Sequence, residues 1–273
     1  KYNYPKYCVK MATGTGKTWV LSAVLIWQYL NAKYEQGNYS KNFLVVAPGL
    51  IVYERLLDAF LGKERENGGS RDFEKSDIYL TQELFLPETY RQDVFGFFKS
   101  SVLKKEEIGT KVTGDGLIAV TNWHLLAGVE DENEEDDEVE APGTTDPTKI
   151  IKSILPARPG TSAGNDLNVL DNSYGKGKEL EFLRSLPDLV VFNDEAHHIH
   201  EVKKAGEVTE VEWQKSLTTI AEPKSDRFIQ IDFSATPYNE VNKKRVYFPH
   251  IIVDFDLKTA IQKGYVKTLI LDK

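Results

Sequence analysis

The chain has 273 residues, of which 41% are hydrophobic, a formal charge of −8 and one cysteine. This length and composition suit a globular protein with one large or two small domains, and the lone Cys8 excludes a disulfide framework. The chain contains no apolar run of membrane-spanning length and no signal peptide, so we expect a cytoplasmic protein without a membrane partner.

The first predicted elements are a short strand over residues 7–11 and a helix over 19–34, joined by the loop Met-Ala-Thr-Gly-Thr-Gly-Lys-Thr at 11–18. Glycines allow backbone angles that let consecutive N–H groups point at phosphate oxygens, and the start of a helix adds its positive dipole end. Such a loop is typical of a nucleoside triphosphate site. The candidate phosphate-binding residues are Thr13, Gly14, Thr15, Gly16, Lys17 and Thr18.

Within this loop, Lys17 is expected to hold the β- and γ-phosphates, and the Thr18 hydroxyl is expected to be a ligand of Mg²⁺. One residue departs from the usual pattern, because Met11 stands where the strict phosphate-loop motif has glycine. Because Met11 replaces this glycine, fewer families of nucleotide hydrolases fit the sequence.

Further along the chain, short aliphatic runs alternate with amphipathic stretches. Near-continuous apolar strands between helices predict an α/β fold with a mainly parallel sheet covered on both faces. The predicted strands are 43–47, 77–81, 117–121, 189–193, 228–233 and 251–256, and the predicted helices are 51–61, 88–101, 178–185, 210–221 and 257–264.

Two stretches predict insertions rather than core elements. Nine acidic residues lie between Glu130 and Glu140, and the formal charge without them would be +1. This block and the Pro- and Gly-containing segment after it offer no apolar face, so residues 130–147 are expected to be a disordered acidic insertion. The alternative is a nucleic-acid mimic that fills a basic groove. Residues 160–178, rich in Gly, Ser, Asn and Asp, predict a second long loop.

Two carboxylates follow the predicted strand at 189–193. Ligands of parallel sheets bind at the carboxyl ends of the strands, so Asp194 and Glu195 are expected near the phosphate loop. Asp194 would anchor the Mg²⁺ with Thr18, and Glu195 would orient and deprotonate the attacking water. A solvated turn is the alternative, and the presence of the phosphate loop argues against it.

Small hydroxyl residues follow the predicted strand at 228–233. Ser234 and Thr236 can hydrogen-bond the side chain of His197, which would couple the γ-phosphate site to a ligand beyond the sheet. Zinc binding by His197, His198 and His200 is disfavoured, because the cluster has no cysteine partner and no further spaced ligand.

The loop at 11–18, the run Asn-Asp-Glu-Ala-His-His at 193–198 and Phe-Ser-Ala-Thr-Pro at 233–237 resemble motifs I, II and III of superfamily two helicases and translocases. Met11 and the doubled histidine resemble the restriction subunit of type III restriction enzymes, over essentially the whole chain. The resemblance implies a three-layer RecA-like P-loop domain with a DEAH-type second motif, in which ATP and Mg²⁺ are bound and Lys17, Asp194 and Glu195 are catalytic.

The same resemblance implies a nucleic-acid track. Residues 45–49 resemble motif Ia and residues 119–124 resemble the strand-end motif before motif II, so Pro48, Gly49, Thr121 and Asn122 are expected to hold the backbone of double-stranded DNA. Further partners implied by the resemblance are a modification methyltransferase subunit and a second RecA-like domain of the same chain.

Nothing after Thr236 resembles the motifs of a second RecA-like domain, and no trustworthy nuclease motif is present. We therefore expect residues 1–273 to form the first motor domain alone, nearly inactive in isolation, because arginine fingers from the second domain contribute ~10³ to 10⁵ in rate. Two alternatives to a DNA translocase remain: an RNA helicase or other remodelling motor, and a nucleotide-gated nucleic-acid-binding module.

Overall fold

The computed structural model describes residues 2–65, 70–122, 178–196, 207–241, 244–248 and 250–267. The predicted acidic insertion at 130–147, nearly all of the predicted loop at 160–178 and the three histidines at 197, 198 and 200 lie outside these residues.

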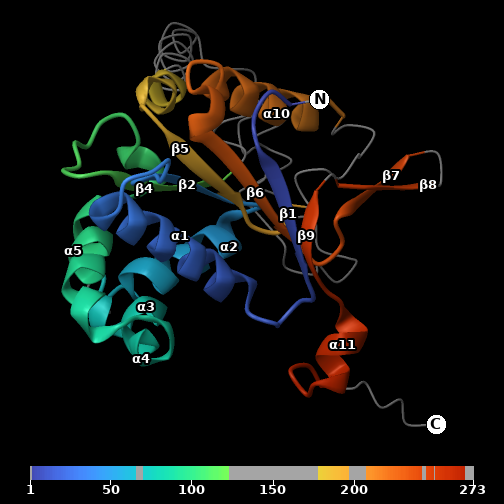
Figure 1. The fold of residues 1–273 in the computed structure, drawn as a ribbon, viewed down its shortest axis with the longest axis horizontal. Coiled ribbons are helices and arrows are strands. Elements are labelled where there is room, and N and C mark those ends of the chain that lie inside the picture. Colours follow the sequence, from blue (N-terminus) through green and yellow to red (C-terminus); the bar gives the residue numbers. More distant parts are fainter. Residues whose placement is uncertain are drawn as a thin grey trace, which may run out of the picture.

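A seven-stranded sheet organises the described residues, with the strand order β3-β4-β2-β5-β6-β1-β9 (Figure 1). Each of its described pairings is parallel, which confirms the predicted α/β class with a parallel sheet. The strands are β1 (Lys6–Met11), β2 (Asn42–Ala47), β3 (Val102–Leu103), β4 (Leu117–Asn122), β5 (Leu189–Asn193), β6 (Phe228–Ser234) and β9 (Ile251–Phe255).

Helices cover both faces of the sheet and make it the middle of three layers (Figure 1). On one face lie α1 (Lys17–Tyr34), α2 (Leu50–Leu61) and α5 (Arg91–Ser101), and on the other lie α10 (Glu207–Ala221) and a helix over 178–185. Because alternate residues of a strand point to opposite faces, Phe43 and Val45 pack toward α1 and α2, whereas Leu44 and Val46 pack toward α10. Burial on both faces explains why β2 is apolar without a break after Asn42.

Aromatic side chains fill the layer between the sheet and α5. The rings of Tyr29 and Phe97 are stacked with centroids 3.9 Å apart, and Phe43 lies between Phe97 and Phe192 at 6.2 Å and 6.3 Å. Each fully buried ring contributes roughly 1.5 to 3 kcal/mol by burial. This packing fixes β5 and β2 against the helices and so fixes the ends of both strands.

The strand predicted over 77–81 is wrong, because these residues form a short helix, α3 (Asp77–Leu80), followed by α4 (Gln82–Phe85). The hydroxyl of Ser76 caps α3 by accepting a hydrogen bond from the N–H of Tyr79 at 3.2 Å. Ile78 is buried but Leu80 is largely exposed, so the alternation that suggested a strand does not correspond to one buried face.

The connection between β6 and β9 contains an antiparallel hairpin that was not predicted, formed by β7 (Tyr238–Val241) and β8 (Lys244–Tyr247). The remaining short elements are α11 (Leu257–Gln262) and the 3₁₀ turns η1 (Phe73–Lys75), η2 (Glu88–Tyr90), η3 (Lys105–Glu107) and η4 (Ser225–Arg227). In the described part of the chain, no helix has both the length and the apolar character that a membrane span requires.

Candidate active site

The strand order brings the three sequence motifs to one edge of the sheet. Strand β6 lies between β1 and β5, so the phosphate loop after β1 and Asp194 after β5 flank the end of β6, where Ser234 lies. Parallel strands end at the same edge, and the registers Lys10 with Ser234 and Asn193 with Asp232 align them. This edge is the usual position of ligand sites in such sheets.

The phosphate loop takes the conformation that its glycines permit. Gly14 and Gly16 have φ angles of +78° and +93°, in the left-handed region that residues with a Cβ rarely adopt. An added Cβ at Gly14 would contact nothing within 4 Å, so the backbone angle rather than crowding requires glycine there. Helix α1 starts at Lys17, directly after Gly16, so its first N–H groups and its dipole are directed at the glycines of the loop.

An ion pair joins the phosphate loop to the residues after β5. Nζ of Lys17 lies 2.7 Å from Oε1 of Glu195, and the two side chains are 7% and 21% exposed. Glu195 itself has a φ of +46°, a left-handed conformation for a residue with a Cβ. Strained backbone of this kind costs of order 1 to 3 kcal/mol and persists only where the surrounding structure fixes it. In this conformation the Glu195 carboxylate contacts the lysine of the loop.

Asp194 is held by two hydrogen bonds and is almost fully buried. Its N–H donates to the carbonyl of Val46 at 2.9 Å, and its Oδ1 accepts from the N–H of Glu195 at 3.0 Å. Burial, and then the neighbouring Glu195 charge, raise the pKa of Asp194 to about 6, while Lys17 acts in the opposite direction. A cation near this carboxylate would therefore stabilise its charged form.

The residues predicted to contact nucleic acid end the two strands next to β5. Pro48 and Gly49 follow β2 and are partly exposed. Thr121 and Asn122 end β4 and are buried, with the Thr121 hydroxyl donating to the Asn122 carbonyl at 3.2 Å. Of these four residues, Pro48 and Gly49 have surface that a ligand could reach, whereas Thr121 and Asn122 do not. Contact of the four residues with nucleic acid stays a prediction.

The predicted coupling residues are placed in part. Ser234 is fully buried at the end of β6, and its Oγ accepts a hydrogen bond from the N–H of Thr236 at 3.0 Å. Thr236 is exposed. The predicted contact with His197 stays a prediction, because His197 lies outside the described residues.

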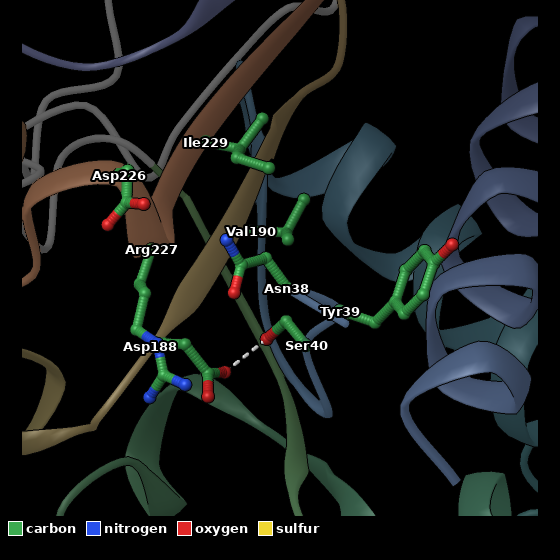
Figure 2. A pocket seen from close by; sticks show the side chains of 8 residues that line it. All are labelled: Asn38, Tyr39, Ser40, Asp188, Val190, Asp226, Arg227 and Ile229. Atoms are coloured by element: carbon green, nitrogen blue, oxygen red, sulfur yellow. Dashed lines mark hydrogen bonds between the residues drawn. The ribbon is translucent and has the colours of Figure 1, made fainter. Parts of the chain in front are cut away.

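A separate pocket lies at the opposite edge of the sheet (Figure 2). Its lining comes from residues that precede β2, β5 and β6 or begin them, among them Ser40, Asp188 and Arg227. The hydroxyl of Ser40 donates to Oδ1 of Asp188, which also accepts from Nδ2 of Asn42 at 3.1 Å. These bonds tie the start of β2 to the turn before β5, and the pocket shares no residue with the phosphate loop.

In a comparison with protein families, residues 1–239 match the type III restriction enzyme, res subunit. The chain belongs to this family. Its described sheet and helices form the helicase-like RecA motor domain of a res subunit, as the three motifs predicted. None of the curated proteins matches the chain.

One feature of this res-subunit site was missed by sequence reasoning. Asn193 at the end of β5 and Asp232 within β6 are buried polar residues in otherwise apolar strands, and Nδ2 of Asn193 donates to Oδ1 of Asp232 at 2.6 Å. Polar residues inside a predicted buried strand are the signal that could have drawn attention to the pair.

Proposed function

We propose that this chain is the first motor domain of a DNA translocase, in the restriction subunit of a type III-like restriction-modification enzyme. The observation that carries the proposal is the contact of Lys17 with Glu195 at 2.7 Å, which unites the phosphate loop with the carboxylates after β5. Family membership supports a helicase-like ATP-binding motor, and the residue roles below are our assignment.

The residues around the loop fit a nucleotide with Mg²⁺. The loop is shaped by the left-handed Gly14 and Gly16 and by the start of α1. In this arrangement the backbone N–H groups of residues 13–18 would bind the phosphates of ATP. The Thr18 hydroxyl and the Asp194 carboxylate are the oxygen ligands that Mg²⁺ prefers. Mg²⁺ held there would neutralise charge that develops on the phosphates.

The ion pair between Lys17 and Glu195 suggests a separate role for each side chain when ATP binds. Lys17 would exchange Glu195 for phosphate oxygens when ATP binds, since a triphosphate carries more negative charge than one carboxylate. The released Glu195 carboxylate would then accept a proton from the attacking water. Asp194 is held by backbone bonds from both sides, which suits a metal ligand that must not move.

The nucleic-acid track would cross the ends of β2 and β4, because they lie beside β5 on the side away from the phosphate loop. The backbone N–H of Gly49, which follows Pro48, can contact a phosphate without reading bases. Thr121 and Asn122 are buried at the end of β4 and would support the surface along which the nucleic acid runs.

A second RecA-like domain would supply arginine fingers, and the isolated chain should hydrolyse ATP barely at all. Assembly with a modification methyltransferase would be a property of the whole enzyme, and DNA cleavage is not assigned to the residues of this chain.

Hydrolysis of ATP by the full-length protein tests this function. With Mg²⁺ present, we expect duplex DNA to stimulate ATP turnover well above the rate without nucleic acid, and a matched RNA duplex to stimulate it much less. Removal of Mg²⁺ with a chelator should abolish the stimulated rate. Stimulation by RNA alone would instead identify an RNA helicase, and nucleotide binding without turnover would identify a nucleotide-gated binding module.

A further inference from the structure

A buried polar network lies behind the candidate active site, on the face of the sheet that α10 covers. Its centre is Asp232, which is fully buried within β6. Oδ1 of Asp232 accepts hydrogen bonds from Nδ2 of Asn193 at 2.6 Å and from Nε2 of Gln230 at 2.9 Å. Nζ of Lys6 lies 3.4 Å from Oδ2. A buried carboxylate is costly unless it is paired and hydrogen-bonded, and these three side chains supply both.

The network joins the three strands that carry the sequence motifs. Lys6 belongs to β1, which leads into the phosphate loop, and Asp232 belongs to β6, which ends at Ser234. Asn193 is the last residue of β5 and directly precedes Asp194. A hydrogen bond between Asn193 and Asp232 therefore fixes the end of β5 against the middle strand of the three.

The far end of the same network lies at α10. The hydroxyl of Tyr4 donates to Oε1 of Gln230 at 3.2 Å and accepts from Nε2 of Gln214 at 2.7 Å. Tyr4 also packs edge-on against Phe228 with ring centroids 4.6 Å apart. Tyr4 precedes β1, so this end lies at the start of the strands, whereas Asp194 and Glu195 follow the end of β5.

The turn after β5 needs such a constraint. Glu195 has a left-handed backbone, which a residue with a Cβ rarely adopts by local preference, and the adjacent Asp194 is buried. The N–H of Asp194 is fixed by the Val46 carbonyl on the β2 side. On the β6 side the Asn193 amide performs this role, and its Oδ1 has no hydrogen-bond partner among the described residues. The bond to Asp232 alone therefore orients the amide.

We propose that Asn193 is a positioning residue for ATP hydrolysis, which holds the Asp194 and Glu195 carboxylates in place through its hydrogen bond to Asp232. This inference rests on the proposed function. The backbone of Asn193 also pairs with Val46 and Asp232 in the sheet, so loss of the side-chain bond would leave β5 in place and shift only the turn that carries both carboxylates. The phosphate loop and Lys17 would keep their places on β1 and α1. Because catalysis is more sensitive to such displacement than binding is, the rate should fall more than the affinity.

The test compares Asn193→Ala with Tyr4→Phe in the full-length protein with duplex DNA. For Asn193→Ala we expect the single-turnover hydrolysis rate to fall about tenfold to a hundredfold. The dissociation constant of a fluorescent ATP analogue should change by less than about threefold, since uniform binding is retained. Tyr4→Phe removes two hydrogen bonds from the far end of the same network, and its rate should stay within about twofold of wild type at a similar loss in melting temperature.

Rescue by a second pair of variants keeps the test decisive if Asn193→Ala does not fold. Asn193→Asp places two carboxylates face to face and should lower the rate, and Asp232→Asn should lower it because the Asn193 amide loses its carboxylate acceptor and Lys6 loses its partner. The double variant restores a hydrogen bond in which residue 232 donates to residue 193, so its rate should exceed that of either single variant. The inference is overturned if Asn193→Ala and Tyr4→Phe slow hydrolysis equally, if Asn193→Ala hydrolyses ATP at the wild-type rate, or if the double variant is no faster than the slower of the two single variants. The Glu195→Gln variant judges the proposed function separately, because it does not alter the network.

Discussion

Glu195→Gln in the full-length protein is expected to lower DNA-stimulated ATP turnover by about 10² to 10⁴, the range over which a general base contributes. Glutamine keeps the size of the side chain but cannot accept a proton from water. ATP should still bind, because the phosphate loop and Lys17 are unchanged and Lys17 loses only the carboxylate at 2.7 Å. Steady-state turnover and equilibrium binding of an ATP analogue measure the two effects separately.

A matched control for this substitution is Glu222→Gln. Glu222 is largely exposed and pairs with Arg184 at 3.3 Å on the surface, so the same chemical change there should leave turnover unchanged. If the Glu195→Gln protein hydrolyses ATP at the wild-type rate, Glu195 is not the base, and the assignment of the carboxylates after β5 is wrong.

Lys17→Ala should abolish nucleotide binding at ordinary concentrations and turnover with it. The Lys17 ammonium is nearly buried at the start of α1, and each charge-assisted hydrogen bond to a phosphate contributes about 1.5 to 3 kcal/mol. Binding to the native state alone raises the melting temperature, so ATP with Mg²⁺ should stabilise the wild-type protein and leave Lys17→Ala unaffected. Thermal unfolding with and without nucleotide provides the measurement.

Lys33→Ala is the corresponding control on the same helix. Lys33 lies near the end of α1 and pairs with Asp93 at 2.6 Å on the surface, away from the loop. Its removal should lower the melting temperature slightly without changing the shift that ATP produces. An equal shift in the Lys17→Ala protein would show that the nucleotide binds elsewhere.

Most of the strands could be predicted from the sequence because their burial on both faces leaves a continuous apolar run. Residues 43–47 and 189–193 are examples, and both coincide closely with β2 and β5. The motifs at the ends of these runs carried further information, since parallel strands end at one edge of the sheet. The phosphate loop and the two carboxylates were therefore expected together, and the ion pair of Lys17 with Glu195 agrees with that expectation.

The features that could not be predicted from the sequence depend on tertiary contacts, which the spacing of apolar residues does not indicate. Residues 77–81 have the composition of a strand, but the Ser76 cap and the packing of Ile78 favour a helical turn. The bond between Asn193 and Asp232 requires the pairing register of β5 with β6, which no local pattern contains. The burial of Thr121 and Asn122 likewise follows from the position of β4 inside the sheet.

A structure of the full-length protein with a non-hydrolysable ATP analogue and Mg²⁺ would show whether ATP binds at the phosphate loop beside Asp194 and Glu195. We predict that the phosphates contact the N–H groups of residues 14–18 and that Nζ of Lys17 leaves Glu195 for a phosphate oxygen. Thr18 and Asp194 should face the metal, with Glu195 beside the γ-phosphate. A nucleotide bound at another place, with the ion pair of Lys17 and Glu195 intact, would show that these residues do not form the ATP site.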